Sequence, residues 1–96
     1  MKSFVFTQER IKHSKMYGCS TMRCTIYKIV KNIPEYIGFV DYNTASTRGA
    51  ISEVFNKLMD LKYIPKKYYN SSKTDWSSGG YYFGEVCEKY SIRELN

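Results

Sequence analysis

Apolar and polar residues follow a strand-like pattern in two short runs of the first half of the chain. Residues 23–31 (RCTIYKIVK) and 36–42 (YIGFVDY) are rich in the β-branched and aromatic side chains that are typical of strands. Proline fixes its own φ and restricts the residue before it, so Pro34 predicts a turn over residues 32–35. We therefore expect the two runs to pair as an antiparallel hairpin.

The hydrophobic pattern changes its period after residue 47. Apolar side chains recur there at intervals of three and four residues, which predicts a helix with one face on the core. The positions of this face are Ile51, Val54, Phe55, Leu58 and Leu61. Pro65 lacks the backbone N–H that a helix interior needs, so we expect the helix to end before it.

The two ends of the chain have weaker patterns. Residues 1–21 hold a short apolar run and then a polar, basic stretch, which we interpret as a partly mobile N-terminal arm. Residues 81–83 favour a strand, and the spacing of Val86 and Tyr90 favours a helix. The predicted fold class is α+β: a small antiparallel sheet, made of the hairpin and this later strand, flanked by the central helix and a short C-terminal helix.

Size and composition restrict the class of protein further. A chain of 96 residues suits one modest core, so we expect residues 1–96 to form a single domain. No apolar run approaches the ~18 residues of a membrane span, so we expect no membrane partner. Cys19, Cys24 and Cys87 have no close pairing signature, which favours a reducing compartment and a cytoplasmic location.

The positive charge is concentrated in the first third of the chain. Residues 1–32 hold seven Lys or Arg against one Glu, a balance of +6, whereas residues 33–96 hold eight bases and eight acids. Segregated basic charge attracts phosphate chains by Coulomb attraction and counterion release, so we expect nucleic acid, and DNA in particular, as the partner. The candidate contact residues are Lys12, Lys15, Arg23, Lys28 and Lys31. The alternative is a basic face that serves solubility alone.

Two short sequences resemble a known family. Ile26-Tyr27, followed after eight residues by Tyr36-Ile37-Gly38, resembles the paired motif of the GIY-YIG endonucleases, with a threonine where that family has its first glycine. The resemblance implies paired strands that carry the two tyrosines, then a helix with an arginine near its start, and a later glutamate that holds one divalent metal ion. Arg48 and Glu88 take these two places.

The resemblance also implies roles for these residues. Tyr27 would help to generate the nucleophile, Tyr36 would support it, Arg48 would bind the phosphate and Glu88 would hold Mg²⁺ or Mn²⁺. These residue types suit phosphodiester cleavage, because an arginine stabilises developing negative charge and a carboxylate binds hard cations. The implied function is metal-dependent cleavage of DNA by a nuclease of phage or mobile-element type.

Two other functions fit the same sequence. A small basic protein of phage type can occupy nucleic acid without cutting it, or inhibit a nucleic-acid-processing or defence enzyme, and its partner is then a protein complex. A structural or assembly protein can use its ten tyrosines as an interface. Cleavage that needs Mg²⁺ distinguishes the first function from these two, and nucleic-acid binding distinguishes the second from the third.

Overall fold

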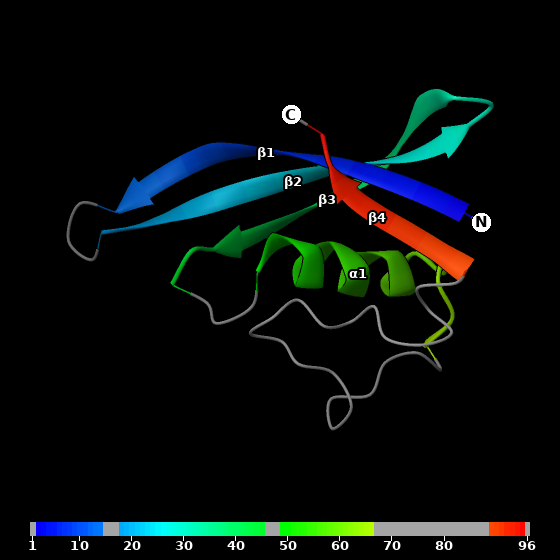
Figure 1. Ribbon diagram of the computed structural model, residues 1–96. Helices are drawn as coiled ribbons and strands as arrows, with labels where there is room; N and C mark the ends of the chain where they lie inside the picture. The colour runs from blue at the N-terminus through cyan, green and yellow to red at the C-terminus, as the bar shows by residue number, and fades with distance from the viewer. Residues whose placement is uncertain (1, 15–17, 46–48, 67–88, 96) are drawn as a thin grey trace.

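The computed structural model describes residues 2–14, 18–45, 49–66 and 89–95. Within these ranges the elements follow the order β1, β2, β3, α1, β4 (Figure 1). Their bounds are Lys2–Ser14 for β1, Cys19–Val30 for β2, Ile33–Asn43 for β3, Ala50–Asp60 for α1 and Tyr90–Glu94 for β4.

The four strands form one mixed sheet in the order β3-β2-β1-β4. Strand β2 runs antiparallel to both β1 and β3, whereas β4 runs parallel to β1. The helix α1 lies along one face of this sheet (Figure 1). We call the opposite face the open face; on β2 it is formed by Thr21, Arg23, Thr25 and Tyr27, which alternate with residues of the core.

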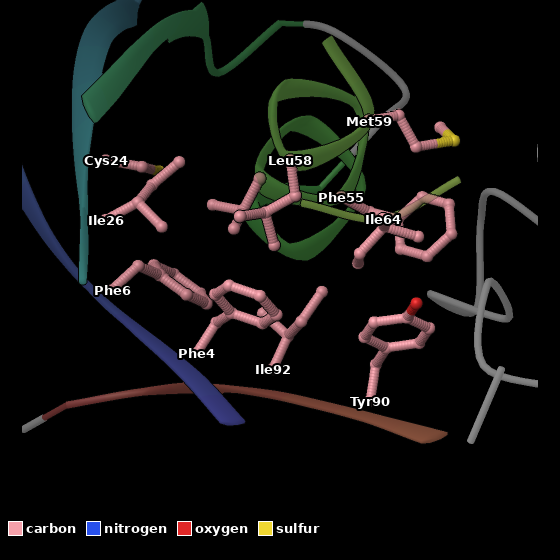
Figure 2. Packing of buried hydrophobic residues seen from close by; sticks show 11 residues of the cluster. Phe4, Phe6, Cys24, Ile26, Phe55, Leu58, Met59, Ile64, Tyr90 and Ile92 are labelled. Carbon is pink, nitrogen blue, oxygen red and sulfur yellow. The ribbon is translucent and has the colours of Figure 1, made fainter. Parts of the chain in front are cut away.

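The core lies between the sheet and α1. Successive residues of a strand point to opposite faces, so two alternate residues from each of β1, β2 and β4 face the helix. Figure 2 shows these side chains meeting those of α1. The cluster consists of Phe4, Phe6, Cys24, Ile26, Val54, Phe55, Leu58, Met59, Ile64, Tyr90 and Ile92.

The predicted central helix and hairpin are both confirmed. Val54, Phe55 and Leu58 of α1 are fully buried, as the helical spacing predicts, while Ile51 packs at the margin of the core. Leu61, which the spacing also places on this face, caps the C-terminal end of α1 and is 37% exposed. Strands β2 and β3 pair antiparallel from Thr21↔Asn43 to Val30↔Ile33.

The turn between β2 and β3 is tighter than expected. The strands continue to Val30 and Ile33, and only Lys31 and Asn32, with φ of 52° and 65°, make the turn. Two central residues with positive φ give a turn whose twist matches the hairpin. Pro34 therefore lies inside β3, where it is tolerated because β3 is an edge strand.

The predicted α+β fold class is wrong, since the described residues form a mostly β structure around a mixed sheet. One reason is the segment 1–21, where we expected a partly mobile arm. Lys2–Ser14 is instead β1, which lies between β2 and β4. Its buried apolar residues are confined to Phe4, Val5 and Phe6, so most of the rest of the strand has the polar sequence of an arm.

The second correction concerns the C-terminal helix. Tyr90–Glu94 is strand β4, with Tyr90 and Ile92 directed into the core. A run of five residues is too short for its period to separate strand from helix, and only the parallel pairing with β1 decides the outcome. The strand expected at residues 81–83 lies outside the described residues.

Candidate functional site

A β-bulge in β3 sets which side chains reach the open face. Tyr36 lies opposite Tyr27 and Gly38 lies opposite Ile26, so Ile37 is an extra residue in β3. Ile26 is fully buried beneath α1, and Tyr27, the next residue along β2, therefore faces the other way. Tyr36 shares the open face with its partner Tyr27.

The bulge brings a further aromatic residue to this face. An extra residue shifts the alternation of a strand by one, so odd-numbered residues after the bulge lie on the same face as Tyr36 before it. Phe39 pairs with Thr25 and Asp41 pairs with Arg23, and both pairs lie on the open face. Phe39 is 42% exposed and Tyr36 is 59% exposed.

Tyr27 and Tyr36 contact each other across the strand pair. Their ring centroids are 6.2 Å apart and the ring planes meet at 71°, an edge-to-face arrangement. Aromatic rings favour this geometry because the positive edge of one ring meets the negative face of the other. The contact holds two phenol groups next to each other on the surface of the sheet.

Arg23 is fixed between Asp41 and Phe39. Its Nε donates to Oδ1 of Asp41 at 2.8 Å and its Nη2 donates to Oδ2 at 3.0 Å. These hydrogen bonds raise the pKa of Arg23 and lower the pKa of the Asp41 carboxyl. The guanidinium carbon lies 4.3 Å from the centroid of the Phe39 ring, so the planar cation sits over an aromatic surface.

Other charges surround this row of side chains. Lys12 of β1 pairs with Thr21, and Arg93 of β4 pairs with Val5, so both exposed cations lie on the open face. Glu9 lies opposite Arg23, on the side away from Asp41. The open face therefore combines exposed rings with charges of both signs.

A shallow groove of about 380 Å³ continues the open face around the edge of β3. Tyr36 and Phe39 of β3 form one part of its wall. Lys57 of α1 and Leu61, which follows the end of α1, form another part. The absence of a side chain at Gly38 lets Leu61 pack close to β3, because a Cβ there would lie 3.1 Å from Cδ1 of Leu61.

The predicted catalytic residues are brought together only in part. Tyr27 and Tyr36 are adjacent, as the resemblance implies. Arg48 and Glu88 lie outside the described residues. The helix α1, near whose start the resemblance places the arginine, packs on the face of the sheet opposite the two tyrosines. Among the described residues, no three His, Cys, Asp or Glu side chains gather where they could hold a metal ion.

The predicted nucleic-acid contacts do not form one patch. Lys12 and Arg23 lie on the open face, and Lys31 is in the β2–β3 turn. Lys28 points to the helix side, where its Nζ lies 5.8 Å from the centroid of the Tyr63 ring. Lys15 is not among the described residues.

Sequence reasoning missed Phe39 and Arg93. Strict alternation from Tyr36 places Phe39 on the covered face, and only the bulge reverses this. The glycine at position 38 was the available signal, because a glycine inside a strand often marks a bulge. Arg93 follows Tyr90, in the segment where the spacing favours a helix, so the sequence does not predict its place on the sheet.

Comparisons with known proteins do not supply a function. No family model matches the chain, and neither does any curated protein or solved structure. Within the described ranges, no helix has the length and apolar character needed to cross a membrane.

Proposed function

We propose that the protein binds nucleic acid through the open face of its sheet. The observation that carries this proposal is the row of aromatic side chains formed by Tyr27, Tyr36 and Phe39, with Arg23 over one of the rings. Exposed apolar side chains that cluster on one surface are typical of interaction sites. Nucleic acid suits this one, because its bases stack on aromatic rings and its phosphates attract cations.

Charge favours nucleic acid over a protein partner. Tyrosine, phenylalanine and arginine are also enriched at protein interfaces, so the aromatic row alone fits a structural or assembly role. The net charge of +6, with Lys12 and Arg93 on the same face as the rings, favours a polyanion.

The proposal includes a reducing, cytoplasmic compartment. Cys19 and Cys24 are free thiols, and Cys24 is fully buried in the core. Proteins of oxidising compartments commonly use their cysteines as disulfides, so these free thiols support the proposal.

Binding of labelled DNA oligonucleotides, followed by fluorescence anisotropy at low salt, tests the proposal. Tyr36→Ala and Phe39→Ala should each weaken binding by roughly 5- to 150-fold, because base stacking on one ring contributes about 1–3 kcal/mol. Ile33→Ala is the matched control, since Ile33 is apolar and 66% exposed but lacks a ring. Failure of the wild type to bind any nucleic acid at low salt would favour a protein interface instead.

A second candidate function is phosphodiester cleavage. It is favoured by one observation, the direct contact of Tyr27 and Tyr36, which agrees with the resemblance to GIY-YIG endonucleases. Under this proposal Arg48 binds the phosphate and Glu88 holds Mg²⁺ or Mn²⁺. The position of α1 on the opposite face of the sheet counts against it.

Supercoiled plasmid incubated with Mg²⁺ or Mn²⁺ tests this second function. Cleavage should stop with EDTA and with Glu88→Gln, which keeps the shape of the side chain but removes its charge. Arg48→Ala should slow cleavage by roughly 10²–10³-fold, the scale for loss of one electrostatic contact in the transition state. Tyr27→Phe should also slow it. Plasmid that is bound but remains intact with either metal would leave binding without cleavage.

A further inference from the structure

We infer that the open face takes single-stranded nucleic acid, with unstacked bases on the rings of Tyr36 and Phe39, and that it discriminates against duplex. This inference rests on the proposed function. It names the class of ligand that the geometry of the face selects.

The open face offers ring surfaces on which bases can stack. A duplex keeps the faces of its bases stacked inside and presents only base edges and phosphates. Tyr36 and Phe39 present ring surfaces, at 59% and 42% exposure. Such surfaces can stack only on bases that have left a helix, which is how single strands are bound.

The two rings are farther apart than stacked bases are. The partners of Tyr36 and Phe39 on β2 are Tyr27 and Thr25, which are two residues apart. At the usual rise of a strand this separates the rings by about 7 Å along the sheet. Bases within one strand of a duplex are about 3.4 Å apart. Successive bases can therefore occupy both rings only when they are unstacked from each other.

Arg23 is held in place by its ion pair with Asp41. Both oxygens of the Asp41 carboxylate accept hydrogen bonds from Arg23, so the guanidinium is held over Phe39 before any ligand arrives. Bases stack on guanidinium planes as well as on aromatic rings. Arg23 thus lies over part of the Phe39 ring and offers its own guanidinium plane for base stacking there.

Positively charged side chains are sparse along the open face. Lys12 lies at one end of the sheet, beside Thr21, and Lys31 lies at the other, beyond Val30. Nine residues of β2 separate these ends, about 30 Å at the usual rise. Arg93 adds one more cation to the face, and Arg23 is already paired with Asp41. So few free cations suit two or three phosphate contacts, and we expect a slope of log affinity against log salt of about −2 or shallower.

The test compares one DNA oligonucleotide as a single strand with the same sequence annealed into a blunt duplex. Wild-type protein should bind the single strand at least about 10-fold more tightly. Tyr36→Phe and Phe39→Tyr should retain the preference, because each keeps a ring. Tyr36→Leu and Phe39→Leu keep apolar bulk without a ring, and each should reduce the preference for the single strand. Circular dichroism spectra unchanged from the wild type establish that each variant is folded.

Two results would overturn the inference while the proposed function stands. One is duplex bound as tightly as single strand, and the other is leucine variants that keep the full single-strand preference. Absence of binding to both forms at low salt would instead remove the proposed function itself.

Discussion

Arg23 of β2 and Asp41 of β3 form a two-bonded ion pair on the open face, with donor to acceptor distances of 2.8 and 3.0 Å. The pair does more than join two strands, because it also places the Arg23 guanidinium over the Phe39 ring. Asp41 is thus an acidic residue that prepares a surface for a polyanion.

This role predicts that removing the negative charge of Asp41 lowers the affinity for DNA, whereas removal of an acidic side chain usually raises it. Asp41→Ala should weaken binding of single-stranded DNA several-fold, because Arg23 is released and its guanidinium is no longer held over Phe39 as a plane on which a base can stack. Glu9→Ala is the matched control, since Glu9 lies opposite Arg23 on β1 and raises the pKa of Arg23 through its charge alone. It should leave affinity unchanged or increase it. Equal increases in both variants, measured by anisotropy at constant salt, would reduce Asp41 to a repulsive charge.

The same ion pair gives a dependence on acid. Arg23 lowers the pKa of the Asp41 carboxyl, chiefly through their hydrogen bonds. The ion pair therefore stabilises the folded protein fully at pH values above the ordinary pKa of an aspartate. This stabilisation is lost as the pH falls through the lowered pKa. As the pH falls below 3.8, the ordinary value for an aspartate, DNA affinity of the wild type should fall more steeply than that of Asp41→Ala. Parallel profiles for the two proteins would show that protonation elsewhere controls binding.

The buried face of α1 predicts a large loss of stability on truncation. Phe55 is fully buried among residues of the sheet and helix, so Phe55→Ala should cost about 3–5 kcal/mol. Urea unfolding followed by circular dichroism measures this. Ile33→Ala, at an exposed site, should leave the midpoint almost unchanged. A wild-type midpoint for Phe55→Ala would mean that the helix is not packed as described.

The bulge predicts a strict requirement for glycine at position 38. Gly38 has φ of 156°, which side chains rarely adopt, and a Cβ there would meet Leu61 at 3.1 Å. Gly38→Ala should therefore cost about 1–3 kcal/mol through backbone strain. Gly49→Ala is the control, because Gly49 has φ of −85° and nothing within 4 Å of an added Cβ. Similar urea midpoints for the two variants would argue against strain at the bulge.

Burial of Cys24 predicts loss of stability at alkaline pH. Desolvation in the core raises the pKa of its thiol from 9.0 to about 12. The folded state therefore favours the neutral thiol, and this stabilisation is present below pH 9 and is lost as the pH rises toward 12. Cys24→Val should show a smaller fall in urea midpoint between pH 8 and pH 11. Some fall should remain, since burial also raises the pKa of Tyr42. Identical falls in both proteins would exclude Cys24 as a cause.

Local patterns in the sequence predicted the local parts of the fold. The helix that carries Val54 and Leu58 and the hairpin that pairs Tyr27 with Tyr36 both join residues close in sequence, so their periods and turn residues are sufficient. The pairing of β1 with β4 joins segments from the two ends of the described chain. No local propensity specifies a pairing of that kind, and the short run at Tyr90 lacked enough residues to establish its period.

The candidate site was predictable to a similar extent. The adjacency of Tyr27 and Tyr36 followed from the hairpin. Arg23 and Lys28 were grouped by charge, although residues an odd number apart on a regular strand lie on opposite faces. The place of Phe39 on the open face depends on the bulge at Ile37, which a strict period of two does not predict.

The parallel pairing of β4 with β1 also has a consequence for how the chain folds. Strands β1, β2, β3 and helix α1 can assemble through contacts between segments that follow one another, whereas β4 must close a loop that includes all of them. Contacts so distant in sequence slow folding, so we expect docking of β4 to limit the refolding rate. Until then Lys2–Phe6 of β1 lack the strand partner that β4 supplies and can pair with another chain, which makes refolding yield dependent on protein concentration.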